Sequence, residues 1–245
     1  MKSWVARQWA EAIIEIQPLF PLALGRQQLR PDPLDSAVML QDALQLRSAA
    51  SGNPSEGCAW TGDLHDAWQV QRRPAFGWLV GELQVAATAY LRVLGFDTDQ
   101  LELHLQRAWP VVSEPGQAVG RHHHPNAHLS AVYYITGDGS GRCGCLRLFP
   151  HRQVNELVPG LAVGHGGPIS ADHPLNAPWQ DVAPQAGLLV LFPAATDHAV
   201  LPNEDDERRC SLSFDLFLSA RASNSRPPEF LAPHPGAWTP LGPTA

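Results

Sequence analysis

The spacing of apolar residues changes near residue 100, and this change constrains the fold more than any other feature. Over residues 76–94 the apolar positions recur every three or four residues, which places them on one face of a helix that follows Pro74 and ends at Gly95. Over residues 101–106 leucines alternate with polar residues, as in a half-buried strand. Helices first and strands afterwards predict an α+β fold built on a sheet sandwich or barrel.

The remaining segments divide the chain into three parts. We expect a mainly helical support region over 1–98, a sheet core over 99–220 and a proline-rich tail over 221–245. Further helices are predicted at 3–16 and from a cap at Ser36 to about Arg47. Further strands are predicted at 127–135, 145–149, 187–192 and 209–218. The 151–180 segment has little periodicity and is either a lid over the site or a surface insertion.

Composition excludes several classes of partner. The formal net charge of the 245 residues is -7 and no basic run occurs, so we expect no nucleic-acid partner. No stretch approaches the roughly 18 apolar residues of a membrane span, and the N-terminus lacks a secretory signal, so we expect no membrane partner. The four cysteines (Cys58, Cys143, Cys145 and Cys210) are interpreted as reduced thiols of a cytoplasmic protein.

A run of histidines precedes one predicted strand, in the stretch RHHHPNAHLSAVYYI at 121–135. Alternate residues of an extended chain share a face, so His122 and His124 point one way and His123 points the other. Two imidazoles at this spacing can bind one metal ion. A solvated loop and a polar cluster in the core are the other interpretations of the run.

The end of the chain supplies further candidates in LLVLFPAATDHAVLPNEDDERRCSLSF. His198 follows a predicted strand, although a lone histidine at such a place is more often a core or loop residue than a ligand. Arg209 opens the last strand, while Arg208 has the opposite parity and should point away. By itself Arg209 is better interpreted as a surface charge beside the acidic run 204–207.

Four motifs in this order resemble the iron(II)- and 2-oxoglutarate-dependent oxygenases: HHHPNAHLSAVYYI, CLRLFP, GLLVLFPAATDHAVLPN and RRCSLSF. More narrowly, they resemble an uncharacterised bacterial branch with an H-x-H-P-N motif. The resemblance covers about residues 101–218, and Trp60 and Trp109 fit the upstream pattern more loosely. It implies a double-stranded β-helix, a jelly-roll or cupin-like barrel, supported by the N-terminal helices.

The resemblance also implies a function and a set of site residues. The activity would be that of a dioxygenase of the hydroxylase type, which couples decarboxylation of 2-oxoglutarate to succinate with oxidation of an unidentified small molecule or protein side chain by O2. His122, His124 and His198 would bind Fe(II). Arg209 would pair with the distal carboxylate of 2-oxoglutarate through its planar guanidinium, assisted by Tyr134 and Ser211.

One position departs from the usual pattern of two histidines and one carboxylate. His124 occupies the place of the Asp or Glu, so either three histidines bind the metal or His124 lies behind the ligands and a carboxylate comes from elsewhere. Asp197 is the nearest acidic candidate, but its parity is opposite to that of His198. Two alternative functions stay open: a three-histidine cupin-like metalloenzyme that does not use 2-oxoglutarate, and a non-catalytic metal-binding barrel.

Overall fold

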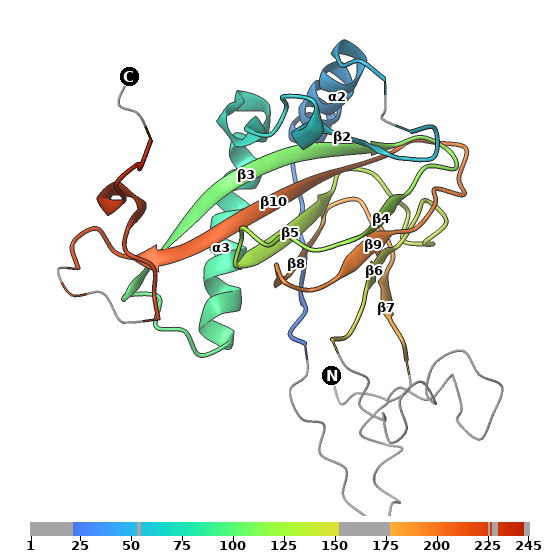
Figure 1. Cartoon of the computed structure of the whole chain (residues 1–245). Helices are drawn as coiled ribbons and strands as arrows, with labels where there is room; N and C mark the ends of the chain where they lie inside the picture. Colours follow the sequence, from blue (N-terminus) through green and yellow to red (C-terminus); the bar gives the residue numbers. More distant parts are fainter. Residues whose placement is uncertain (1–21, 53–54, 152–176, 225, 227–229, 243–245) are drawn as a thin grey trace, which may run out of the picture.

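Two antiparallel sheets dominate the described part of the chain, which in this computed structural model comprises residues 22–52, 55–151, 177–224, 226 and 230–242. In Figure 1 the smaller sheet lies to the right of and below the long strands β3 and β10. The larger sheet has the order β1 (Gly25–Gln28), β8 (Leu188–Pro193), β5 (Leu129–Tyr134), β10 (Arg209–Ala220), β3 (Leu101–Ser113) and β2 (Trp60–Thr61). The smaller sheet has the order β4 (Val119–His122), β9 (His198–Val200), β6 (Leu146–Leu148) and β7 (Gln180–Val182).

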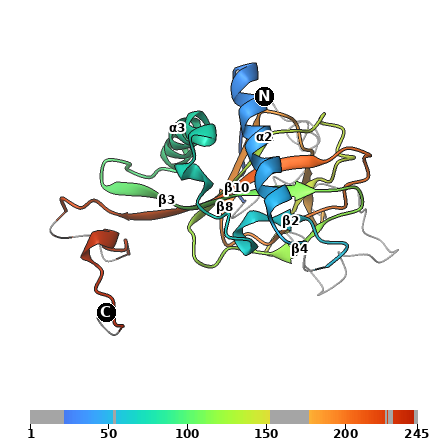
Figure 2. The same cartoon turned by 90° about the horizontal axis from the view of Figure 1, so that it is seen from above.

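Two helices cover the outer face of the larger sheet, and Figure 2 shows both on the same side of it. They are α2 (Pro33–Ala49) and α3 (Gly77–Val93). The helix expected at 76–94 is thereby confirmed. The cap expected at Ser36 is wrong: Asp32 caps α2, because its side chain accepts a hydrogen bond of 2.9 Å from the backbone of Leu34 and Pro33 suits the first turn. Short 3₁₀ turns lie at Gly62–Leu64 (η1), Val70–Arg72 (η2), Pro74–Phe76 (η3) and Pro235–Ala237 (η5).

Alternation along the strands of the larger sheet separates an apolar face from a functional face. On β10 the residues that pack in the core beneath the helices are Cys210, Leu212, Phe214 and Leu216. The opposite face of the same strand carries Arg209, Ser211, Ser213 and Asp215. A second core, which includes Tyr134 and Phe192 from the larger sheet and Leu146 from the smaller one, joins the two sheets. The polar face of β10 therefore points into the space between the sheets.

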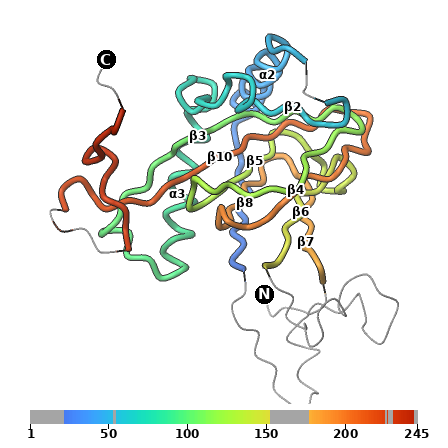
Figure 3. The backbone as a smooth tube through the Cα atoms, in the orientation of Figure 1, coloured from blue at the N-terminus to red at the C-terminus, as the bar shows by residue number. Residues whose placement is uncertain are grey.

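The predicted strands include every strand of six or more residues and one short strand, β6. The expected strands correspond to β5, β6, β8 and β10, and the strand expected at 101–106 extends over thirteen residues as β3. Five short strands of two to four residues (β1, β2, β4, β7 and β9) were not expected from the sequence. Figure 3 shows residues 230–242 at the end of β3 and β10 that lies farthest from the smaller sheet. The predicted helix at 3–16 and most of the 151–180 segment lie outside the described residues.

Candidate metal and co-substrate site

Three histidines meet where the two sheets face each other. His122 ends β4 and His198 begins β9, and the two residues are paired across these antiparallel strands. His124 follows β4 by two residues, and its backbone donates a hydrogen bond of 3.0 Å to the carbonyl of Ala194. One ring nitrogen from each histidine lies within 4.8 Å of the other two. The structure thus brings together the three side chains that were expected to bind a metal.

In His122 and His198 the hydrogen bond made by Nδ1 determines which ring nitrogen is available to a metal. Nδ1 of His122 lies 2.8 Å from the carbonyl oxygen of Gly120, and Nδ1 of His198 lies 2.9 Å from that of Thr196. Because a carbonyl oxygen only accepts, each Nδ1 must carry the proton and donate it. The Nε2 atom of each neutral ring then keeps a lone pair. This is the tautomer that a metal-binding histidine needs, held in place by the bond behind it.

Burial keeps two of these rings neutral. It lowers the pKa of His198 to about 3, with the neighbouring His122 lowering it further. Burial also lowers the pKa of His122, while the bond to Gly120 acts in the opposite direction. A neutral imidazole is the form that binds a divalent metal ion. At neutral pH the pair is therefore ready to bind a cation without first losing protons.

Arg209 is a buried cation on the inner face of β10, and only 1% of its surface is exposed. Its Nη1 donates to the carbonyl of Gly144 at 3.1 Å, and its Nη2 donates to the hydroxyl of Ser113 at 2.5 Å. Its Nε has no hydrogen-bond partner, and no carboxylate of the described residues pairs with it. Burial lowers the pKa of this guanidinium, yet an arginine stays charged in proteins. A buried charge without a counter-ion is costly, so the site is suited to an anion.

Tyr134 and Ser211 accompany Arg209. The two residues are direct cross-strand partners between β5 and β10, and both are buried on the face that carries Arg209. Burial raises the pKa of the Tyr134 phenol, so its hydroxyl keeps its proton at neutral pH. Within the described part of the chain this hydroxyl makes no hydrogen bond. Both side chains are therefore available to donate to an oxygen atom beside the guanidinium.

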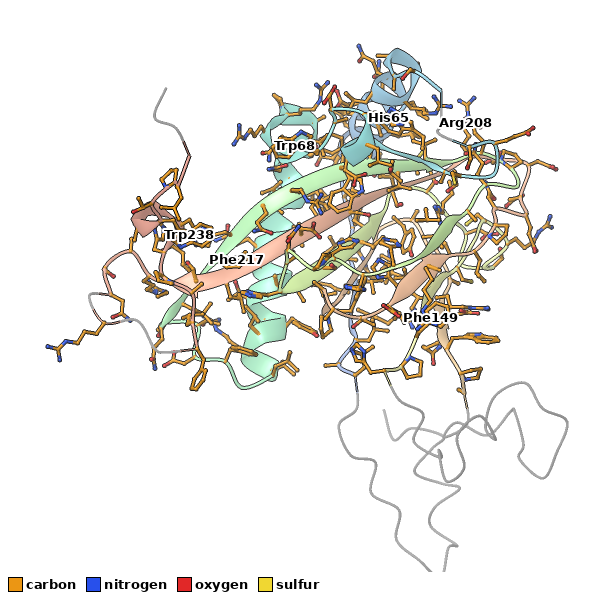
Figure 4. The ribbon with its side chains drawn as sticks, viewed as in Figure 1. His65, Trp68, Phe149, Arg208, Phe217 and Trp238 are labelled. Atoms are coloured by element: carbon orange, nitrogen blue, oxygen red, sulfur yellow. The ribbon has the colours of Figure 1, made fainter. Side chains whose placement is uncertain are left out.

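Several neighbouring charged residues point away from the site, as their parity predicts. Arg208 forms an ion pair of 2.7 Å with Glu114, and Figure 4 shows it at the margin of the molecule. Asp197 pairs with Arg121 at 2.7 Å and with Nδ1 of His123 at 3.2 Å. Asp197 is thus engaged on the surface and does not supply the missing carboxylate.

The carboxylate closest to the histidines is one that the sequence analysis missed. Asp215 is fully buried, and its Oδ1 lies 2.5 Å from Nδ1 of His124. Its Oδ2 accepts from Nε of Arg107 at 2.9 Å. Position 215 has the same parity as Arg209 and Ser211, so a polar residue on the inner face of the last strand was the available signal.

Two cavities meet at the histidines. The inner cavity lies between the sheets, and its lining includes all three histidines together with Tyr134, Arg209 and Ser211. The outer pocket opens to solvent and has a volume of about 490 Å³, which suits a small-molecule group. Thr61, Trp109, Val119, His122 and His124 line both. A molecule in either cavity would therefore contact the same two histidines.

Comparison with known proteins finds a family model that matches part of the chain. Residues 107–215 match the family model described as "Putative 2OG-Fe(II) oxygenase". Comparison with curated proteins gives no match. None of the helices in the described part of the chain has the length and apolar character that a membrane-spanning helix needs.

Solved structures of low sequence identity share the fold. The epimerase SnoN from nogalamycin biosynthesis, a non-heme α-ketoglutarate-dependent enzyme, has a TM-score of 0.57 and 18% identity, covering 88% of this chain and 92% of SnoN. A Pseudomonas putida prolyl-4-hydroxylase has a TM-score of 0.51 and 20% identity, over 79% of this chain and 92% of the hydroxylase. HygX from Streptomyces hygroscopicus, solved with nickel and 2-oxoglutarate, has a TM-score of 0.53 and 12% identity, over 80% and 83%. These likenesses confirm the predicted jelly-roll type of fold.

Proposed function

We propose that the inner cavity holds both the metal and the co-substrate of an iron(II)- and 2-oxoglutarate-dependent dioxygenase, a proposal supported by the match of residues 107–215 to a family model of such oxygenases. His122, His124 and His198 would bind Fe(II) through their Nε2 atoms. The bound iron supplies the chemistry of the family, in which decarboxylation of 2-oxoglutarate is coupled to oxidation of a second substrate by O2. The residues of the chain supply binding, orientation and exclusion of water.

The observation that carries this proposal is the buried, unpaired charge of Arg209 in the cavity that the three histidines line. A metal site alone has no need of a buried guanidinium in the lining of its cavity. A dicarboxylate does, because one end can bind the metal while the other end pairs with the guanidinium through the free Nε–H. Tyr134 and Ser211 would donate to the same carboxylate. The cost of burying this charge is then compensated by the co-substrate.

The outer pocket would receive the substrate that is oxidised. It shares His122, His124 and Trp109 with the inner cavity, so a group bound there lies beside the metal on the side away from Arg209. The substrate is an unidentified small molecule or protein side chain. The three-part division at 98 and 220, the cytoplasmic location and the absence of nucleic-acid or membrane partners stay predictions from the sequence.

Anaerobic titration tests this function. Addition of Fe(II) and then 2-oxoglutarate to the wild-type protein should produce the weak visible absorption of an iron–keto acid chelate. The Arg208→Ala variant should give the same absorption, while Arg209→Ala should require far more 2-oxoglutarate. Binding of iron with no spectral response to 2-oxoglutarate in the wild type would favour a three-histidine enzyme that uses no keto acid, or a metal-binding barrel without turnover.

A further inference from the structure

Among the residues that the structure describes, Asp215 is the one buried carboxylate that contacts a candidate metal ligand, and the proposed function leaves it without a role. It lies in the middle of β10, directly opposite Arg107 on β3 and Ser130 on β5. Its side chain is 1% exposed, so burying its charge is costly unless hydrogen bonds and a counter-ion compensate the lost hydration. We propose that Asp215 is a positioning residue that supplies, through His124, the negative charge that the three-histidine ligand set lacks. This inference rests on the proposed function.

The two oxygen atoms of Asp215 are divided between two partners. Both Arg107 donors, Nε and Nη2, contact Oδ2 alone, which leaves Oδ1 to accept from Nδ1 of His124. A structural arginine–aspartate pair in this chain uses both oxygens: Arg147 binds Asp181 through Nε to Oδ1 at 2.8 Å and Nη2 to Oδ2 at 2.7 Å. The Asp215 carboxylate is thus oriented toward His124 as well as toward the arginine.

This bond determines what His124 offers to a metal. A carboxylate accepts the proton of Nδ1, so the lone pair of the ring is on Nε2, as in His122 and His198. Arg107 and His124 both donate hydrogen bonds to this carboxylate, and such donors favour its ionised form. An ionised carboxylate behind a ligand histidine increases the basicity of that ligand. The charge of the usual carboxylate ligand is therefore present, one residue farther from the metal.

The same arrangement explains why position 124 is not an aspartate. A carboxylate at 124 would place an oxygen close to the present position of Nδ1, which is 2.5 Å from Oδ1 of Asp215. Two carboxylates at that distance cannot both be ionised. Histidine at 124 and aspartate at 215 are thus a matched pair, and exchanging one member alone creates either an unpaired donor or a repulsive contact.

A second hydrogen-bonded set of one arginine, one aspartate and one histidine gives the matched control. Arg121 binds Asp197 through Oδ2, and Oδ1 of Asp197 lies 3.2 Å from Nδ1 of His123. The connectivity is that of Arg107, Asp215 and His124, but the histidine faces solvent. Asp197→Asn therefore removes the same kind of carboxylate beside the site without affecting a metal-directed ring.

The test measures Fe(II) and Co(II) affinity by competition with a chelator under anaerobic conditions. Asp215→Asn should weaken metal binding by about 10–100-fold and raise the Fe(III)/Fe(II) potential, while Asp197→Asn should change the affinity less than about twofold. In a His124→Asp background the effect of Asp215→Asn should reverse, so that the double variant binds metal more tightly than His124→Asp alone.

The reversal separates a role at the metal from a role in folding, because loss of a structural ion pair lowers affinity in both backgrounds. If Asp215→Asn does not fold, the comparison of His124→Asp with the double variant decides. Unchanged affinity of Asp215→Asn, or the same direction of change in both backgrounds, overturns the inference while leaving the proposed function intact. Failure of the wild type to bind metal overturns both.

Discussion

His122 and His198 are direct partners across the β4–β9 pair, and their ring centroids lie 4.3 Å apart. The backbone pairing of two short strands therefore fixes the separation of two proposed ligands. His124 is held to the same place by a different set of contacts: its backbone bonds to Ala194, and its ring lies 5.1 Å from that of His198. The positions of the three histidines therefore depend on the contacts between residues 122–124 and residues 194–198.

The first prediction concerns the histidine run. His122→Ala and His198→Ala should each lose Co(II) by more than the 10–100-fold that is typical of a residue behind the ligands, because each removes a direct bond. His123→Ala is the control. It lies between two proposed ligands, but its ring pairs with Asp197 on the surface, so metal affinity should stay unchanged. Equal losses in all three variants, measured by chelator competition, would contradict the assignment of faces.

The second prediction concerns the two adjacent arginines. Arg209→Ala should weaken 2-oxoglutarate binding by about 2–5 kcal/mol, the usual cost of deleting one partner of a buried charge pair, with little change in Fe(II) affinity. Arg208 is largely exposed and pairs with Glu114, so Arg208→Ala should cost less than about 1 kcal/mol. Calorimetric titration of the metal-loaded proteins measures both. Similar losses from the two variants would show that Arg209 does not contact the co-substrate.

The third prediction concerns Gly144, whose carbonyl accepts from Arg209. Gly144 has a φ of +92°, and a Cβ there would lie 2.3 Å from the carbonyl oxygen of Leu201. Gly144→Ala should therefore displace the loop, lower the melting temperature and weaken 2-oxoglutarate binding. Gly139→Ala is the matched control, since its φ is +82° but its nearest neighbours would lie 3.9 Å away. It should show the backbone strain without the loss of binding.

The fourth prediction concerns pH. The pKa of His198 is about 3 in the folded chain and near 6.5 when exposed, so the unfolded state gains a proton first as pH falls. The metal-free protein should be most stable above pH 6.5 and should lose up to about 1.4 kcal/mol per pH unit below it through this residue. His198→Asn should reduce that slope, as measured by urea unfolding at pH 7.5 and pH 5. Identical slopes in the two proteins would show that His198 titrates normally.

The sequence predicts well on which face of a strand a side chain lies, but it predicts poorly which side chains meet across strands. Whether a side chain points inward follows from alternation within one strand, which is why Arg209 could be distinguished from Arg208 before the structure was known. The contact of Asp215 with His124 joins segments far apart in the chain, and no local pattern encodes it. The strands β4 and β9, of four and three residues, are also too short for alternation to appear, so their pairing was not predicted.

The inner cavity and the outer pocket differ in how freely their residues can be substituted. Arg209 and Asp215 lie on one face of β10, a central strand bonded to β3 and β5 on its two sides. Apart from His122, His124 and the β3 residues Arg107 and Trp109, the outer pocket is lined by segments outside that sheet centre, notably residues 58–64 and 118–121. Substitutions in these rim segments leave the central hydrogen-bond ladder untouched. Over evolutionary time, and in directed evolution, the preference for a substrate can therefore diverge while the oxidative machinery is inherited unchanged.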